Sequence, residues 1–184
     1  MATALARRRV LMSPDEIERA IARMAHEIVE PDDAQTGLLL IGIRRGGEAL
    51  ARRLSSKIAE IGGRAPNLGF LNINLYRDDD MARELPESEI RSEITGRTVV
   101  LVDDVLYTGR TVRAALDAVT DLGRPNAIRL AVLIDRGLRE LPIQGDYVGK
   151  HVPSSRREHI DVVLSPQRSE SDEVALADED RAAT

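Results

Sequence analysis

Two adjacent carboxylates stand directly before a turn of small residues in the stretch "VVLVDDVLYTGRT" (99–111). Asp103 and Asp104 end an apolar run, and "TGRT" (108–111) opens what the pattern predicts as a helix. Carboxylates accept hydrogen bonds from vicinal hydroxyls, whereas backbone N–H groups and threonine hydroxyls at a helix start suit a phosphate monoester. Gly109 lets the chain approach that phosphate closely. The whole string therefore predicts a ribose 5-phosphate site.

Other interpretations of these motifs are weaker or left open. A bare Asp-Asp pair at a strand end more often caps a turn or holds a cation, so the prediction depends on the fixed spacing of the whole string. The P-loop sequence G-x-x-x-x-G-K-[ST] is absent. "GIRRGG" (42–47) follows another apolar run but is not G-x-G-x-x-G. Its arginines, Arg44 and Arg45, could neutralise a diphosphate or form a solvated basic turn.

The elements that must position these residues alternate along the chain. Ser13-Pro14 with Glu16 is a capping-box helix start, and the helix it begins extends to Pro31. Further helices are predicted over 48–61 and 111–122, and strands over 38–43, 69–76, 98–103 and 128–135. Continuous apolar strands that alternate with helices indicate an α/β fold with a parallel sheet covered on both faces. Ligands of such sheets bind at the carboxyl ends of the strands.

Size and composition favour one ordinary globular domain over residues 1–184. The chain is 42% apolar and 31% charged, and it has a net charge of −5 and no cysteine. These values exclude a disulfide framework and a thiolate metal site, and they fit a cytoplasmic protein. We expect no membrane segment and no bulk polyanion binding. A local basic face remains compatible with the composition.

Two segments depart from the alternation. Residues 77–95 are too long and polar for a simple connection, so we expect either a flexible functional loop or a surface hairpin without a role. The stretch 168–184 is acidic, and we expect it to be partly disordered, with "DEVALA" (172–177) as a candidate edge strand.

The string 99–111 resembles the phosphoribosyl-pyrophosphate (PRPP) motif of type I phosphoribosyltransferases. The stretches "IERAIARMAHEIVE", "LNINLYRDD", "VRAALDAVTDLGRPNAIRLAVLIDRGLRELPI" and "DYVGKHVPSSRRE" resemble the PyrR family of pyrimidine operon attenuators, which are also uracil phosphoribosyltransferases. The resemblance covers nearly the whole chain. It implies the type I phosphoribosyltransferase fold, a mostly parallel central sheet flanked by helices, with a flexible hood loop over 77–95.

The resemblance also implies a reaction and a set of site residues. Uracil and PRPP, with Mg²⁺ carried on the PRPP rather than held by a protein metal site, would give UMP and diphosphate. Asp103, Asp104 and Arg77 would be catalytic, and Tyr76 and Arg77 would open the hood loop. The 5-phosphate would be held by Val105, Leu106, Tyr107, Thr108, Gly109, Arg110 and Thr111, the diphosphate by Arg44, Arg45 and Gly46, and the base by Asp135, Arg136, Val148 and Lys150.

A second activity implied by the resemblance is UMP-dependent binding of pyr leader RNA by a homo-oligomer, a dimer or larger. The candidate RNA contacts are Arg19, Arg23, His26 and Arg139. The chain departs from the family where Ala22, Pro31, Leu138 and Gln144 stand in place of frequent polar or basic residues, and where Arg45-Gly46-Gly47 replaces Thr-Arg-Gly. The alternative function is therefore a phosphoribosyltransferase for uracil or another base that has lost RNA binding.

Overall fold

The computed structural model of the chain describes residues 8–30, 37–74 and 86–178. The elements in these ranges are β1 (Arg8–Met12), α1 (Pro14–Val29), β2 (Leu38–Ile43), α2 (Gly47–Gly62), β3 (Asn67–Leu71), β4 (Thr98–Leu106), α3 (Arg110–Leu122), β5 (Ala127–Asp135), β6 (Tyr147–His151), β7 (Glu158–Val163) and β8 (Glu173–Asp178). None of the helices in these ranges is long and apolar enough to cross a membrane.

A five-stranded parallel sheet with the order β3-β2-β4-β5-β6 forms the centre of the molecule. Every residue of β2 is buried, as expected for a strand covered on both faces. The predicted strand over 38–43 is confirmed with the same bounds. Of the predicted strand 69–76, residues 69–71 belong to β3 (67–71), residues 72–74 lie outside any strand, and residues 75–76 lie outside the described residues. β6 was not predicted, and its residues 147–150 lie within a strand rather than after one.

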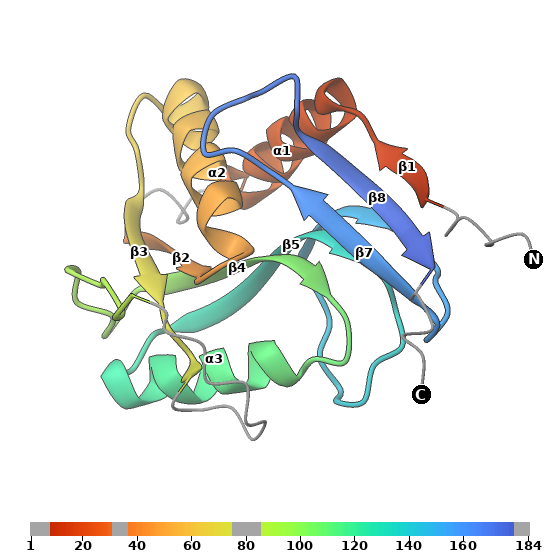
Figure 1. The fold of residues 1–184 in the computed structure, drawn as a ribbon. Coiled ribbons are helices and arrows are strands. Elements are labelled where there is room, and N and C mark those ends of the chain that lie inside the picture. Colours follow the sequence, from red (N-terminus) through yellow and green to blue (C-terminus); the bar gives the residue numbers. More distant parts are fainter. Residues whose placement is uncertain (1–7, 31–36, 75–85, 179–184) are drawn as a thin grey trace, which may run out of the picture.

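The helices cover the two faces of this sheet unequally, α1 and α2 on one side and α3 on the other (Figure 1). The alternation along β2 explains the division. Leu38 and Leu40 belong to the cluster that includes α1 and α2, whereas Leu39 and Ile41 belong to the cluster around α3. This two-sided covering confirms the predicted α/β architecture.

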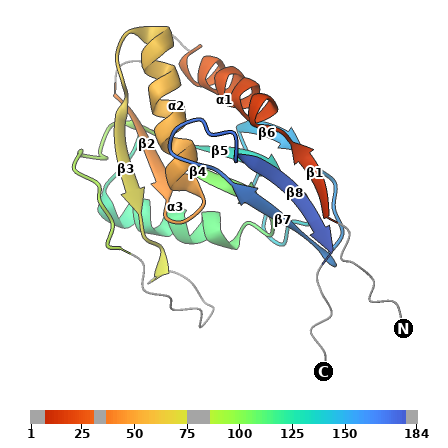
Figure 2. The ribbon, with the colours of Figure 1, turned by 45° about the horizontal axis from the view of Figure 1, so that its top comes forward.

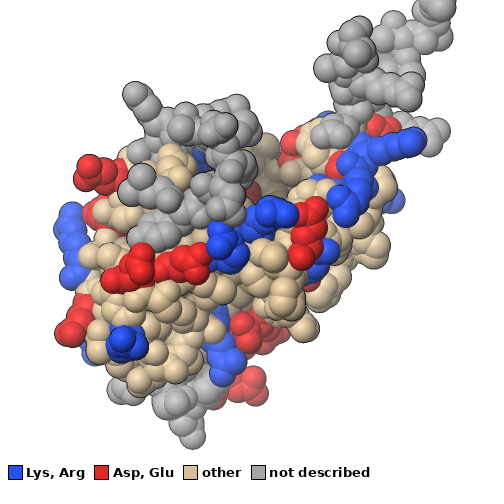
Figure 3. Space-filling view, turned by 90° about the horizontal axis from the view of Figure 1, so that it is seen from below, with Lys and Arg blue, Asp and Glu red and all other residues tan. Residues whose placement is uncertain are grey.

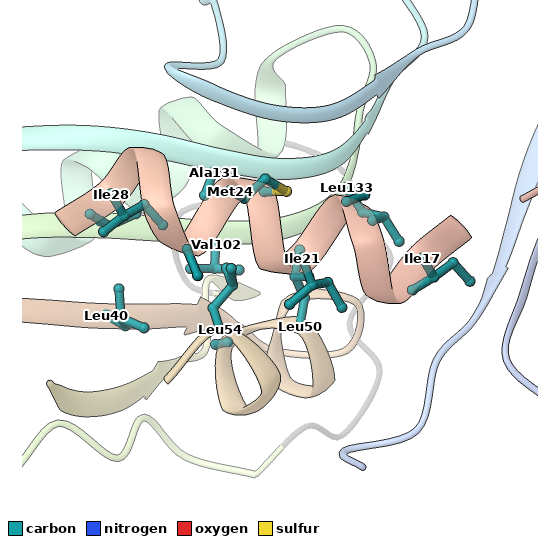
Figure 4. Packing of buried hydrophobic residues seen from close by; sticks show 14 of the residues in the cluster. Ile17, Ile21, Met24, Ile28, Leu40, Leu50, Leu54, Val102, Ala131 and Leu133 are labelled. Atoms are coloured by element: carbon teal, nitrogen blue, oxygen red, sulfur yellow. The ribbon is translucent and has the colours of Figure 1, made fainter. Parts of the chain in front are cut away.

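The helix α1 begins and packs as its sequence predicts. The Ser13 hydroxyl accepts a hydrogen bond from the Glu16 N–H, and the Glu16 carboxylate accepts one from the Ser13 N–H. The apolar stripe of the helix faces α2 and the central sheet, where Met24 and Ile21 meet Leu54 and Leu50 (Figure 4). The buried stripe of α1 therefore forms one side of the hydrophobic core.

A second, three-stranded antiparallel sheet combines the two ends of the described chain, in the order β1-β8-β7. It lies beside α1 on the face of the central sheet that α1 and α2 cover (Figure 2). The strand expected over 172–177 is present as β8, but the prediction that it is an edge strand is wrong. β8 is the central strand of this sheet, because β1 and β7 pair with its two edges.

A buried ion pair joins the turn before β8 to the helices. Asp172 is 1% exposed and Arg53 of α2 is 5% exposed. The Arg53 guanidinium donates to Asp172 at 2.6 Å and to Glu18 of α1 at 2.5 Å. The segment 168–178 is thus ordered by specific contacts, and only 179–184 of the predicted acidic tail lies outside the described residues.

The segment predicted as one long loop, 77–95, has two parts. Residues 77–85 lie outside the described residues. The remainder packs beside β3, where Glu89 and Phe70 exchange backbone hydrogen bonds of 2.7 and 2.9 Å and Ile94 is buried. The chain therefore returns to the edge of the central sheet before β4 begins.

Candidate functional site

The paired carboxylates lie where β4 runs past its neighbour β2. The β2 pairing stops at Val102, whereas β4 stays paired with β5 as far as Leu106. Asp103 and Asp104 are therefore strand residues at the carboxyl edge of the sheet, rather than residues after the strand. They line a cleft of about 290 Å³, together with Ile43, Arg44, Arg45, Gly46, Ile73, Asn74, Val105 and Thr111.

The phosphate loop, defined here as residues 107–111, turns the chain from β4 into α3. Gly109 has φ 94° and is the N-cap residue of α3, so this position uses the conformational freedom expected of it. The Thr108 hydroxyl accepts a hydrogen bond of 3.4 Å from the Arg110 N–H. Thr111 reaches the cleft from the first turn of the helix. The loop thus brings hydroxyl and backbone N–H donors beside the two aspartates.

Two residues of the predicted phosphate site, Val105 and Leu106, precede the loop and are less accessible than it. Within the loop, the Arg110 side chain forms an ion pair. Leu106 is buried in the α3-side cluster, so only its backbone is available at the edge. Val105 is half-buried at the cleft. The Arg110 guanidinium lies 2.9 Å from Glu140.

The diphosphate loop, defined here as residues 44–46, contains one engaged and one exposed arginine. Arg44 donates to the Glu87 carbonyl at 2.9 Å and to Glu48 at 3.0 Å, and its side chain is 9% exposed. The side chain of Arg44 therefore supports residues 86–90 as well as bordering the cleft. Arg45 is exposed and has φ 84°, a conformation that costs a non-glycine residue about 1–3 kcal/mol and that is typical of functional sites.

Gly46 and Asp104 are in direct contact across the cleft floor. A Cβ atom added at Gly46 would overlap the Asp104 carboxyl group, so this loop position requires glycine. Burial raises the pKa of Asp104, against the opposing effects of the Val105 N–H and the Asp103 side chain. The Val105 N–H donates to Asp104 at 2.7 Å. The ionised form of such a carboxylate is stabilised when a ligand donates hydrogen bonds to it, and ribose hydroxyls are donors of this kind.

Of the four predicted base contacts, Asp135, Val148 and Lys150 lie on β5 or β6 and Arg136 directly follows β5, and their side chains make separate sets of contacts. Asp135 accepts from Arg139 at 2.6 Å, and although burial opposes ionisation, this bond and the Gly137 N–H hold its pKa below the ordinary value. Arg136 is buried, donates to Ser154 and to two carbonyls of the 155–158 turn, and stacks 4.2 Å from the Tyr107 ring centre.

The other two base candidates, Val148 and Lys150, are directed into the scaffold. Val148 packs against the α3-side cluster, and the Lys150 ammonium donates to the Leu11 carbonyl of β1 at 2.8 Å. Lys150 is the penultimate residue of β6, and its role as a base contact stays a prediction.

The candidate RNA contacts fall into two places. Arg19, Arg23 and His26 are exposed on one side of α1, whereas Arg139 lies behind the phosphate loop. Arg23 also donates to the Val148 and Gly149 carbonyls at 2.9 and 2.6 Å, so it caps the free edge of β6. On the α3 side, basic and acidic side chains are interspersed instead of forming a basic face (Figure 3).

Several residues of the site follow from the fold but not from the motifs. Asn74 and Ile73 line the cleft after β3; both belong to the stretch "LNINLYRDD", but no site role was predicted for either of them. Tyr76 and Arg77, predicted to open the hood loop, lie outside the described residues. Among the described residues, no group of three or more acidic or histidine side chains could hold a metal ion by itself.

Comparison with known proteins agrees with this arrangement. Residues 13–167 match the family model of the phosphoribosyl transferase domain. The bifunctional protein PyrR of Pelotomaculum thermopropionicum is 54% identical over 84% of this chain and 87% of its own length. The chain belongs to the PyrR family. The PyrR proteins of Deinococcus radiodurans (52% identity, 84% of this chain, 86% of its own length) and Herpetosiphon aurantiacus (50%, 92% and 97%) are further relatives.

Solved structures support the fold assignment. The hypoxanthine phosphoribosyltransferase of Trypanosoma cruzi, in complex with its product IMP, superposes with a TM-score of 0.65 at 22% identity, over 84% of this chain and 81% of that one. The Staphylococcus aureus hypoxanthine phosphoribosyltransferase gives 0.65 at 20% identity, over 80% and 79%. At these identities the likeness concerns the fold alone, and it confirms the predicted phosphoribosyltransferase fold.

Proposed function

We propose that the protein transfers the phosphoribosyl group of PRPP to uracil, and that its UMP-bound form binds pyr leader RNA and attenuates transcription. The observation that carries the proposal is the meeting of two aspartates, the phosphate loop and the diphosphate loop in one cleft of a PyrR-family chain. Each part suits one chemical group of PRPP: hydroxyls, 5-phosphate and diphosphate.

Substrate binding follows from these groups. Asp103 and Asp104 accept hydrogen bonds from the ribose 2- and 3-hydroxyls. The 5-phosphate receives donors from the start of α3, where Thr108 and Thr111 supply hydroxyls. The diphosphate lies against the diphosphate loop, where Arg45 supplies the exposed positive charge. The base lies toward the ends of β5 and β6, near Asp135.

Mg²⁺ fits this donor set only together with the substrate. Two adjacent carboxylates can supply part of an octahedral oxygen shell, and diphosphate and ribose oxygens would complete it. When bound, the ion neutralises charge on the departing diphosphate. Asp103 and Asp104 are the residues that would hold it.

The chemical step is a substitution at the anomeric carbon of ribose. The bond from uracil N1 to this carbon forms as the bond to the diphosphate oxygen breaks, and the N1 proton passes to the departing diphosphate or to solvent water. Positive charge develops on the ribose ring, and the Asp104 carboxylate beneath the cleft stabilises it. No covalent nucleophile is required, which is consistent with a chain that contains no cysteine. Arg77 and Tyr76 would close over the reacting centre and exclude water.

The enzyme proposal is tested by incubating purified protein with PRPP, Mg²⁺ and uracil, with hypoxanthine and guanine in parallel reactions. We expect UMP from uracil and no product from the purines. The variant Arg129→Gln should form UMP at the wild-type rate and serves as a control for substitution of an arginine outside the site. Arg129 is on β5 at the end remote from the cleft, and its side chain is 53% exposed. Purine nucleotide formation without UMP would contradict the proposed base.

The regulatory proposal is tested by binding of pyr leader RNA with and without UMP at several salt concentrations. We expect UMP to tighten binding and Arg19→Gln to weaken it and lower the salt slope by about 1, because one phosphate contact is lost. RNA binding that UMP leaves unchanged would contradict the UMP-dependent regulation, and absence of RNA binding with and without UMP would favour the second candidate function, a phosphoribosyltransferase for uracil or another base that has lost RNA binding. The engaged Arg23 and the replacement residues Leu138 and Gln144 are the observations on its side.

We also propose that the protein acts as a homo-oligomer, a dimer or larger, at the concentrations used in these assays. Light scattering after size-exclusion chromatography tests this, and a monomeric mass would contradict it.

A further inference from the structure

Arg139 lies behind the phosphate loop, and its guanidinium is engaged on every side. It donates to the Tyr107 carbonyl at 2.9 Å and to the Asp135 carboxylate at 2.6 Å. The other acceptors are the carbonyls of Ile143 at 2.8 Å, Gly137 at 3.2 Å and Leu106 at 3.4 Å. A planar guanidinium with five donors can satisfy such a set, and an ammonium group cannot.

The turn that carries Arg139 adopts an unfavourable backbone conformation. Gly137 has φ 73° and Leu138 has φ 59°, and the second value is uncommon for a side chain of this size. Asp135 accepts a hydrogen bond of 3.0 Å from the Gly137 N–H and also binds Arg139. The carboxylate therefore fixes the turn at its start and the arginine at its end.

The connection from β5 to β6 contacts the phosphate loop at side chains, through the Arg110–Glu140 ion pair and the stacking of Arg136 on the Tyr107 ring, and it also binds backbone carbonyl groups of the loop. Arg139 binds the Tyr107 carbonyl, and the N–H groups of Glu140 and Leu141 donate to the Thr108 carbonyl at 3.0 and 3.2 Å. In a planar trans peptide the C=O and the N–H point in opposite directions. A Tyr107 carbonyl held from behind therefore directs the Thr108 N–H away from Arg139, and a held Thr108 carbonyl does the same for the Gly109 N–H.

We propose that Arg139 is a positioning residue for phosphate recognition: it directs the Thr108 N–H toward the 5-phosphate by holding the Tyr107 carbonyl. In this proposal it acts on the substrate through the phosphate loop rather than by a contact of its own. The proposal rests on the proposed function, since it concerns the 5-phosphate subsite of that cleft. Because Asp135 neutralises Arg139, the effect is one of geometry rather than of long-range charge.

The test compares UMP with uridine, two ligands that differ only in the 5-phosphate. Titration calorimetry on wild type, Arg139→Gln and Arg139→Lys measures both affinities. We expect UMP affinity to fall about tenfold or more in both variants, because the Thr108 N–H no longer donates a charge-assisted hydrogen bond to the 5-phosphate. Uridine affinity should change less than about threefold, because uridine has no 5-phosphate. Arg129→Gln should retain the wild-type preference.

The outcomes separate this proposal from others. Equal weakening of UMP and uridine indicates a general structural role and overturns it, and so does an unchanged preference. Recovery of UMP affinity in Arg139→Lys would show that charge, not the planar geometry, matters, and would also overturn it. If Arg139→Gln does not fold, Arg139→Lys by itself must show the same selective loss of UMP. A wild-type protein without preference for UMP would contradict the proposed function instead.

Discussion

Asp172 is a buried carboxylate and Asp104 a half-buried one, and their surroundings shift the two pKa values in opposite directions. Asp172 accepts hydrogen bonds from Arg53 and from the N–H groups of Ser165 and Ser169. Burial opposes its ionisation, but these donors keep its pKa below the ordinary value. Asp104 lies against Gly46, and burial raises its pKa. A scaffold carboxylate is satisfied within the chain, whereas a site carboxylate is left to be satisfied by a ligand.

The largest effect is expected when the scaffold pair is broken. Asp172→Ala should lower the free energy of unfolding by about 3–5 kcal/mol, because Arg53 then remains buried without its main partner. Urea denaturation at pH 7 measures this change. Glu170→Ala, which removes an exposed partner of Arg168 in the same turn, should leave the midpoint unchanged. An Asp172→Ala protein as stable as wild type would show that the pair adds nothing.

The second effect concerns activity without a loss of stability. Asp104→Asn should reduce kcat for UMP formation by about 10²-fold or more, because the carboxylate charge opposite the developing positive charge is lost. The free energy of unfolding at pH 7 should equal or exceed that of wild type, because desolvation disfavours the charge of this half-buried carboxylate and the substitution removes that charge. A destabilisation as large as that of Asp172→Ala would show that Asp104 serves the scaffold as well.

The two carboxylates should also give opposite pH dependence. The stabilisation by Asp172, whose folded pKa is lowered, is fully present above the ordinary pKa of 3.8 and is lost as pH falls through the lower folded value. The cost of ionising Asp104, whose folded pKa is raised, appears as pH rises from 3.8 through the higher folded value. Unfolding free energies of Asp172→Asn and Asp104→Asn, measured from pH 3 to pH 7 beside wild type, should therefore diverge as pH increases. Parallel curves would contradict the assignment.

The smallest effect concerns the loop that covers Asp104. Arg45→Gly and Arg45→Ala both remove the guanidinium, but only glycine adopts φ 84° without cost. Arg45→Gly should therefore be more stable than Arg45→Ala by about 1 kcal/mol, a value obtained from thermal unfolding of the two variants. Both should show a raised KM for PRPP to a similar extent. Equal stabilities would mean that the loop relaxes when the arginine is removed.

The local parts of the fold could be predicted because short-range patterns determine them. The capping box at Ser13 and the apolar run 38–43 give a helix and a buried strand that the structure confirms. β1 was missed because "RRVLM" has its pairing partner, β8, more than 160 residues away along the chain, at Glu173–Asp178. β8 was recognised as a candidate strand, but its central position depends on that same distant pairing.

The candidate site shows the same limit at the level of side chains. The types and spacing of Asp103, Asp104 and Gly109 predicted their place at the sheet edge, because motif and strand end coincide. The roles of the arginines could not be predicted in this way. Arg44, Arg136 and Arg139 bind carbonyls of segments that sequence places far from them or in no defined direction. The sequence shows which side chains are positively charged, but the tertiary structure determines which groups each of them contacts.

The pairing of β1 with β8 has a consequence for synthesis on the ribosome. The first strand to emerge has no partner until the last strand has been made, so the small sheet can form only after the central sheet has had time to collapse. Arg53 likewise waits for Asp172. The nascent chain therefore carries an exposed strand edge until β8 is made, and of the two carboxylates that bind Arg53 only Glu18 is present until Asp172 is made.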